Sequence, residues 1–159
     1  GFEVFASWQD DSQPVDPATV DWMTFGPGKF PYRLRQKPGP LNALGQVKFM
    51  FPNEYDVYLH DTPSRDLFAK TVRAFSSGCI RLEKPIDLAA LLLRPNGLDR
   101  ERIDAILAEG KTSRINLKNR VPVHLTYLTA WIGEGGTVHF RDDIYGRDAR
   151  LAKALNTSL

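Results

Sequence analysis

The residues with the clearest chemical potential are Cys79, the only cysteine of the chain, and the histidine at position 60. A thiol attacks a carbonyl carbon as the thiolate, and a nearby imidazole is the commonest group that favours this form. One cysteine cannot close an intrachain disulfide or build a cysteine-rich metal site. Its remaining roles are nucleophilic chemistry and the ordinary role of a small buried hydrophobe, and the residues alone leave both open.

Alternation along two short segments sorts their side chains onto two faces. In residues 57–60 and 79–82, one face receives the apolar side chains Val57, Leu59, Ile80 and Leu82. The other face receives Tyr58, His60, Cys79 and Arg81. We therefore expect two strand ends to present these four side chains to one groove while their neighbours build a core.

Longer motifs around these residues resemble the L,D-transpeptidase catalytic (YkuD) domain. Tyr-Leu-His-Asp-Thr-Pro surrounds the histidine, and Ser-Ser-Gly-Cys-Ile-Arg surrounds the cysteine. Further similar stretches are Leu67-Phe68, Arg73-Ala74, Val20-Asp21-Trp22, residues 38–45 with Lys48-Phe49, and residues 142–145. The likeness covers nearly the whole chain and is greatest to the YcbB-like Gram-negative branch of the family.

The sequence departs from the His-Gly and Ser-His-Gly-Cys pattern of the wider family at Asp61 and Ser77. The resemblance implies that both residues are normal for the YcbB-like branch, and neither removes a side chain that the chemistry requires. It also implies a mainly β fold, a β-sandwich-like catalytic domain with two or three flanking helices.

The motif residues predict how the site would work. Gly78 has no Cβ, so backbone amides can turn toward an oxyanion there, and we expect the amides of Gly78 and Cys79 to form that hole. His60 would take the thiol proton and return it to the leaving amine. Alternation turns Asp61 away from the His60 face, so a backbone carbonyl is expected to orient the imidazole, as the resemblance also implies.

Four residues are candidates for substrate contacts, namely Tyr58, Asp61, Ser77 and Arg81. The Arg81 guanidinium could bind a substrate carboxylate, brace the Cys79 loop or form a surface ion pair. Tyr58 could donate its hydroxyl to the oxyanion region or only line the groove. Ser76 and Ser77 offer a rival nucleophile, but Cys79 matches the family signature, so we expect the serines to hydrogen-bond the turn.

Composition narrows the class of protein. A chain of 159 residues with 42% hydrophobic and 25% charged residues has the size and composition of one soluble globular domain. A net charge of +2, without a basic run among aromatics, argues against a nucleic-acid partner. His124 and His139 lack metal-ligand spacing, so no metal is expected and no cofactor is implied. No apolar run is long enough to span a bilayer.

The pattern along the chain predicts strands, then helices, then strands. We expect strands at 46–51 and 56–60, a helix capped by Thr62 with Leu67 and Phe68 on its buried side, and helices at 85–94 and from Asp99 to Gly110. Strands are predicted at 114–117, 122–132 and 137–141, the last two as a hairpin. A short helix is expected after Tyr145.

Residues 1–45 are interpreted as a lid or cap-like segment of the catalytic domain, and residues 46–159 as its core. The aromatic residues of the first segment could wall a groove or simply pack; they are Trp8, Trp22, Phe25, Phe30 and Tyr32. The resemblance implies more strands before Gly1, so we expect an N-terminally truncated piece of the domain.

The resemblance implies a periplasmic peptidoglycan L,D-transpeptidase that acts in cell-wall biogenesis and cell shape. Cys79 would form a thioester with a tetrapeptide stem, and the amine of a second stem would complete a 3→3 cross-link. Carbapenem β-lactams would acylate the same thiol, and other cell-wall synthesis proteins would be partners. Hydrolysis would make an L,D-carboxypeptidase, and lipoprotein attachment is a third outcome. The alternative from another class is an inactive or truncated piece that binds peptidoglycan as a scaffold.

Overall fold

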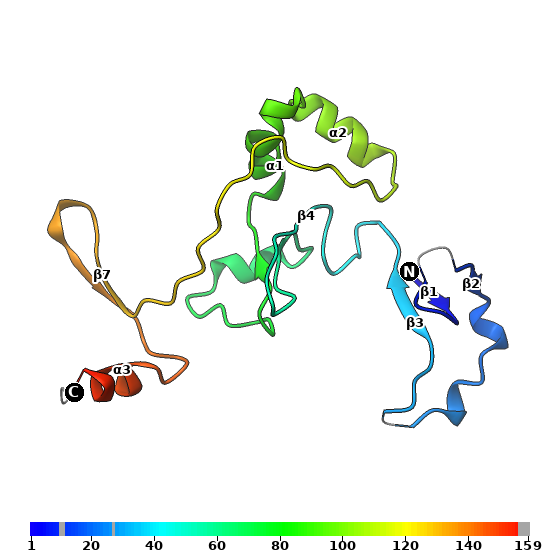
Figure 1. Ribbon diagram of the computed structural model, residues 1–159, viewed down its shortest axis with the longest axis horizontal. Coiled ribbons are helices and arrows are strands. Elements are labelled where there is room, and N and C mark those ends of the chain that lie inside the picture. The colour runs from blue at the N-terminus through cyan, green and yellow to red at the C-terminus, as the bar shows by residue number, and fades with distance from the viewer. Residues whose placement is uncertain (10–11, 27, 156–159) are drawn as a thin grey trace. The chain divides into compact units, whose positions relative to one another are not determined.

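A computed structural model describes residues 1–9, 12–26 and 28–155 (Figure 1). The chain divides into two compact units, Gly1–Val121 and Pro122–Leu159. This division differs from a boundary after residue 45, and the separation of a lid from a core stays a prediction. None of the described helices is long and apolar enough to cross a membrane.

The first unit begins with a small antiparallel sheet that the sequence pattern did not predict. Its central strand β1 (Phe2–Phe5) pairs with β2 (Pro14–Val15) on one side and with β3 (Arg33–Gln36) on the other. Val4 and Phe5 are buried. The guanidinium carbons of Arg33 and Arg35 lie 4.7 and 4.6 Å from the centre of the Phe5 ring. Both arginines pack on the Phe5 ring, a contact that stabilises this sheet within a Pro- and Gly-rich segment.

A second sheet holds the two motifs. Strand β4 (Lys48–Phe49) pairs antiparallel with β5 (Leu59–His60), and β5 pairs parallel with β6 (Ile80–Arg81). The predicted strands at 46–51 and 56–60 are therefore present as shorter paired segments. A parallel partner for β5 requires a long connection, which residues 61–79 provide.

Two helices pack beside this sheet, as the sequence predicts. Helix α1 (Pro85–Leu93) begins with a proline and is followed by a 3-10 turn, η4 (Arg94–Asn96). Gly97 caps this turn with a φ of 78°, a conformation that favours glycine. Helix α2 (Arg100–Ala108) is capped by Asp99, whose side chain accepts a hydrogen bond from the Arg102 amide at 3.0 Å. The centre of the core consists of three buried side chains, Ala89, Leu93 and Ile103. Val47 and Phe49 pack against them.

The helix expected to begin at Thr62 is instead a short 3-10 helix, η3 (Arg65–Ala69). Thr62 does not cap it. The Thr62 amide donates to the Asp61 carboxylate at 2.7 Å, and its hydroxyl accepts from the Ser64 amide at 3.2 Å. Because Thr62 belongs to the hydrogen-bond network of Asp61, the helix begins later than the sequence predicts. Leu67 and Phe68 are only half-buried.

The second unit contains a hairpin and a helix. Strand β7 (Ala130–Ile132) pairs antiparallel with β8 (Val138–Phe140) across the turn η5 (Glu134–Gly136), and helix α3 (Asp148–Ala154) follows. The hairpin and the last helix confirm the prediction. The predicted strand at 122–132 is wrong for residues 122–129, and residues 114–117 form no strand. An apolar, β-prone segment forms a strand only where its backbone finds a pairing partner.

The structure supports the predicted mainly β fold only loosely. The described strands are short, and they form two sheets of three strands and one of two. Helices α1, α2 and α3 contain about as many residues as all of the described strands. The architecture that the described residues show is three helices with several small sheets.

Candidate active site

The parallel pairing of β5 with β6 brings the two motifs together. Leu59 is opposite Ile80, and His60 is opposite Arg81. The Ile80 amide donates to the Tyr58 carbonyl at 3.1 Å, and the Leu82 amide donates to the His60 carbonyl at 2.8 Å. Paired residues of parallel strands share a face, so this register places four side chains on one face of the sheet: Tyr58, His60, Cys79 and Arg81.

His60 is buried, with 5% of its surface exposed. Its Nδ1 forms a hydrogen bond with the backbone carbonyl of Asp61. A carbonyl oxygen only accepts, so Nδ1 must carry the proton, and Nε2 of the neutral ring is then an acceptor. A backbone carbonyl therefore orients the imidazole, as the sequence analysis expected, and it selects the tautomer that can take a proton at Nε2.

The Cys79 thiol is half-buried beside Tyr58 and the Asp56 carbonyl. Its Sγ lies 4.0 Å from the Asp56 carbonyl oxygen. The pKa of the Tyr58 phenol is raised, first by burial and then by the charge of Cys79 and a hydrogen bond with it. Tyr58 therefore stays protonated beside the sulfur, and a protonated phenol is a donor that can stabilise a thiolate. Its ring also meets the His60 ring, with centroids 5.8 Å apart, so Tyr58 contacts both members of the pair.

The turn before Cys79 is braced by a serine. The Ser76 hydroxyl donates to the Cys79 carbonyl at 2.6 Å and accepts from the Gly78 amide at 3.3 Å. Ser76 thus hydrogen-bonds the turn, as expected. Gly78 has a φ of 149°, and a Cβ there would lie 3.3 Å from Val57 Cγ2, so the position requires glycine. To bind an oxyanion, the Gly78 amide would have to give up its hydrogen bond to the Ser76 hydroxyl.

Arg81 and Ser77 border the same face of the turn and strand β6. Arg81 is half-buried, and its Nε is buried without a hydrogen-bond partner among the described residues. Ser77 is exposed. The substrate contacts assigned to both residues stay predictions.

Asp61 points away from the His60 face into a network of donors. Its carboxylate is buried and accepts from the Gln46 amide at 2.8 Å and from the Thr62 amide, and it forms an ion pair with Arg65. A Cβ on Gly45 would lie 2.3 Å from its Cγ, so the loop before β4 approaches this carboxylate closely. Its contacts are thus within the protein, and a substrate contact stays a prediction.

Asn53 lies in a turn that the sequence predicts between two strands but was not a predicted site residue, and it shapes the loop in front of Cys79. The Asn53 amide nitrogen donates to the carbonyls of Phe51 and Val57 at 3.0 and 2.7 Å. Its oxygen accepts from the amides of Tyr55 and Val57, both at 3.0 Å. The loop holds Asp56 at a φ of 51°, and the Asp56 carbonyl meets Sγ. In the sequence, an asparagine that directly follows a proline indicates a turn at this position.

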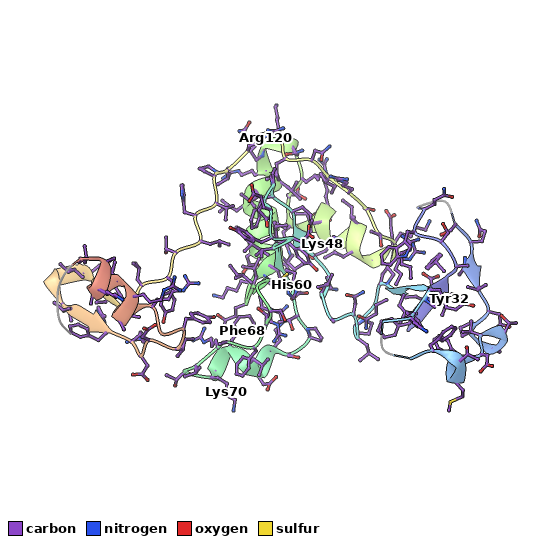
Figure 2. All side chains as sticks on the ribbon, turned by 60° about the horizontal axis from the view of Figure 1, so that its bottom comes forward. Tyr32, Lys48, His60, Phe68, Lys70 and Arg120 are labelled. Carbon is purple, nitrogen blue, oxygen red and sulfur yellow. The ribbon has the colours of Figure 1, made fainter. Side chains whose placement is uncertain are left out.

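A second residue that was not assigned a role is Lys48, which is opposite His60 in the β4–β5 pair. Its Nζ lies 5.8 Å from the centre of the Tyr58 ring. Figure 2 shows Lys48 and His60 in the same region of the first unit. The face that carries Cys79 therefore has a cation on the β4 side as well as Arg81 on β6.

Aromatic residues of the first segment pack on one another. Trp22 stacks on Phe30 with centroids 6.2 Å apart, and Phe25, Phe30 and Tyr32 meet at 5.7 to 5.9 Å. Mutual packing accounts for these four, whereas Trp8 is largely exposed. Their role as a groove wall stays a prediction.

The described residues contain no group of three or more His, Cys, Asp and Glu side chains that could hold a metal ion. What the face does contain is a thiol, an imidazole with an accepting Nε2, a protonated phenol beside the thiol, and two cations. Such an arrangement can carry out acyl transfer through a thioester.

Comparison with known proteins gives these residues a family context. The L,D-transpeptidase catalytic domain family (YkuD) matches residues 3–137, which include β4, β5 and β6. A Haemophilus influenzae protein provisionally named an L,D-transpeptidase is 46% identical over 137 residues. The match covers 86% of this chain and 27% of the relative, so the chain spans about a quarter of that relative's length.

Proposed function

This chain belongs to the L,D-transpeptidase catalytic domain family, and we propose that it is the catalytic part of a peptidoglycan L,D-transpeptidase in which Cys79 is the nucleophile. Three helices with several small sheets are consistent with that domain. The observation that carries the proposal is the register of β5 and β6, which places His60, Tyr58 and Cys79 on one face. We further propose that the protein belongs to the YcbB-like branch.

The first half of the reaction forms the acyl-enzyme. His60 Nε2 takes the Cys79 proton, and the thiolate attacks the L,D amide between meso-diaminopimelate and D-alanine of a tetrapeptide stem. The oxyanion accepts hydrogen bonds from the backbone amides of Gly78 and Cys79, and from the Tyr58 hydroxyl once the sulfur has bonded to carbon. The carbon–nitrogen bond breaks, His60 returns the proton to the leaving amine, and D-alanine departs from a thioester on Cys79.

The second half consumes the thioester. The side-chain amine of a second stem attacks the thioester carbonyl, and His60 takes the proton that this amine loses. The carbon–sulfur bond breaks, a 3→3 cross-link forms and the thiol is restored. Water in place of the amine would give an L,D-carboxypeptidase product, and a lipoprotein amine would give attachment to the wall. The intermediate is common to all three outcomes.

The setting of this reaction is part of the same proposal. The substrate is peptidoglycan, which is built outside the cytoplasmic membrane, so the protein would work in the periplasm, in cell-wall biogenesis and cell shape, beside other synthesis proteins. Carbapenems would acylate Cys79, because their strained carbonyl resembles the scissile amide. No step requires a cofactor.

Intact-protein mass spectrometry with a carbapenem tests the proposal. The expected result is one adduct located on Cys79, together with release of D-alanine from a tetrapeptide stem. A protein that stays unmodified, releases no D-alanine and still binds peptidoglycan sacculi would contradict the enzyme and support a scaffold. Product analysis with two stems separates cross-linking from hydrolysis.

A further inference from the structure

We propose that Lys48 is a substrate-binding residue, and that Lys48 and Arg81 bind carboxylates of the stem peptide on the two sides of His60. This inference rests on the proposed function, because it takes its substrate from that reaction. It adds a residue on β4 to a site otherwise built from β5, β6 and the turn before β6.

The sheet register places the two cations. Lys48 is opposite His60 in the antiparallel β4–β5 pair, and His60 is opposite Arg81 in the parallel β5–β6 pair. Side chains at paired positions of neighbouring strands share a face, so the three residues form one row across the sheet. Neighbouring strands lie about 4.8 Å apart, so the backbones of Lys48 and Arg81 are separated by roughly 10 Å, with the general base between them.

In the described part of the chain, these two cations form no ion pair with a carboxylate. The ion pairs recorded for the described residues join Arg35, Arg65 and Arg100 to carboxylates, and none of them uses Lys48 or Arg81. Lys48 is exposed, and its Nζ lies over the Tyr58 ring, on the side of the sheet that carries the thiol. Arg81 Nε is buried without a partner in the described part of the chain.

The chemistry of the stem matches this row. The scissile amide must lie at His60 and Cys79. The leaving D-alanine carries a carboxylate on one side of that amide, and the diaminopimelate residue carries one on the other. Cations on both sides of the base would hold both anions while the amide faces the thiol. A guanidinium can bind a carboxylate with two hydrogen bonds, and an ammonium acts as a point charge.

The electrostatic part of the inference is tested by alkylation of Cys79 in the full-length protein. Iodoacetate and iodoacetamide attack the same thiolate and differ in charge, so the ratio of their rates reports the local field and cancels effects on the thiolate itself. Lys48→Met is expected to lower the iodoacetate-to-iodoacetamide ratio about two- to fivefold, the range of an exposed charge pair, and Lys48→Arg to keep it. The effect should shrink in high salt.

The matched control is Lys111→Met, which removes an exposed lysine after α2 and should leave the ratio unchanged. An unchanged ratio in Lys48→Met overturns the inference. So does an equal loss in Lys111→Met, because the field would then come from the net charge of the whole molecule.

Stem kinetics tests the substrate. Lys48→Met is expected to raise the KM for a tetrapeptide stem two- to fivefold with kcat changed less than twofold, and amidation of the stem carboxylates should abolish the difference. A wild-type KM in Lys48→Met, with turnover intact, overturns the inference and leaves the proposed function standing. A wild-type protein that turns over no stem, while the alkylation ratio still depends on Lys48, overturns the proposed function and leaves an anion site.

Discussion

His60 is the residue on which most of the proposed chemistry depends. Its Nδ1 proton is donated to the Asp61 carbonyl, so proton transfer must occur at Nε2. Its ring contacts the Tyr58 ring, and Cys79 raises the pKa of the Tyr58 phenol after the larger effect of burial. In the proposed reaction the phenol would stabilise the thiolate, and the imidazole would accept its proton. The roles proposed for Cys79 and His60 lead to two predictions about single residues.

Cys79→Ala is expected to abolish carbapenem acylation and cross-linking. The free energy of unfolding should change by no more than about 1 kcal/mol, because the half-buried thiol contributes little packing. Mass spectrometry and denaturant unfolding check the two parts. Acylation that persists in this variant would contradict the assignment and direct the search to Ser76 and Ser77.

His60→Ala is expected to slow acylation at least ~100-fold, the usual scale for the loss of a positioned general base. The side chain is buried, so circular dichroism must first show that the variant is folded. Stopped-flow acylation against the wild type then measures the loss. A folded variant that reacts at the wild-type rate would show that the thiolate forms without this histidine.

At the scale of elements, one ion pair joins the strand ends near the proposed catalytic pair, His60 and Cys79. Asp61 directly follows β5, and Arg65 begins η3. The Arg65 guanidinium binds the Asp61 carboxylate and also donates to the carbonyls of Leu82 and Glu83, which directly follow β6. The pair therefore ties the end of β5 to the end of β6, and with them His60 to the strand that follows Cys79.

Arg65→Met is expected to lower the free energy of unfolding by about 1–3 kcal/mol, because the buried Asp61 carboxylate loses its ionic partner. Acylation should slow by about tenfold, since the two strand ends would lose alignment. Arg65→Lys keeps the charge but cannot reach all three acceptors. Its stability and its acylation rate should therefore lie between those of the wild type and those of Arg65→Met.

Arg100→Met provides the control for Arg65. Its ion pairs with Asp87 and Asp104 are exposed, so the loss should be no more than about 1 kcal/mol, with unchanged acylation. Equal effects of the Arg65 and Arg100 substitutions on acylation would contradict a specific role for the Asp61 pair.

In the second unit, the turn before α3 is held by Asp143. Its pKa is lowered to about 2, because the backbone amides of Asp148 and Arg147 and the Tyr127 hydroxyl donate to its carboxylate. A lowered pKa contributes stability that is present above the unfolded pKa of about 4 and is lost as pH falls through about 2. The amide signals of α3 should therefore hold to about pH 3 in an NMR titration and change near pH 2.

Asp143→Asn should remove this transition, leaving the amide signals of α3 insensitive to pH over the same range. A wild-type midpoint near the ordinary aspartate value of about 4 would contradict the hydrogen-bonded carboxylate.

At the scale of the whole molecule, the described residues bury few large apolar side chains. The buried hydrophobic residues are Val4, Phe5, Val20, Ala89, Leu93, Ile103 and Ala152. A chain of this length commonly buries a larger core. The apolar side chains of β5 and β6 and of the residue after β6 are also incompletely buried, since Leu59, Ile80 and Leu82 are only half-buried. The match with the Haemophilus influenzae relative also covers only 27% of that protein. We propose that further sequence of the natural protein completes the catalytic domain.

The full-length protein is therefore expected to be acylated by a carbapenem faster than residues 1–159 expressed alone, by about tenfold or more, because preorganisation of the site depends on the surrounding core. Melting curves, oligomeric state and acylation rate measured side by side test this expectation. A monomeric 1–159 chain that melts cooperatively and reacts at the full-length rate would contradict it, and would leave a self-sufficient domain.

Local signals in the sequence determined several elements. Pro85 and Asp99 mark the starts of α1 and α2, and the hairpin of β7 and β8 follows its glycine-rich turn. Alternation also sorted Tyr58 and Cys79 onto one face, which the register of β5 and β6 confirms. These features depend on hydrogen bonds and side-chain directions within a few residues of each other, and a single sequence contains that information.

Tertiary structure decided which segments pair and what the polar side chains contact. Residues 122–129 are as β-prone as β7 but have no partner strand among the described residues, whereas the Gly- and Pro-rich start of the chain forms a sheet. The pairing of Lys48 with His60, and the burial of Asp61 under Gly45 and Arg65, likewise arise from contacts across the chain. Strand pairing joins groups distant in sequence, so their contacts appear only when the backbone closes around them.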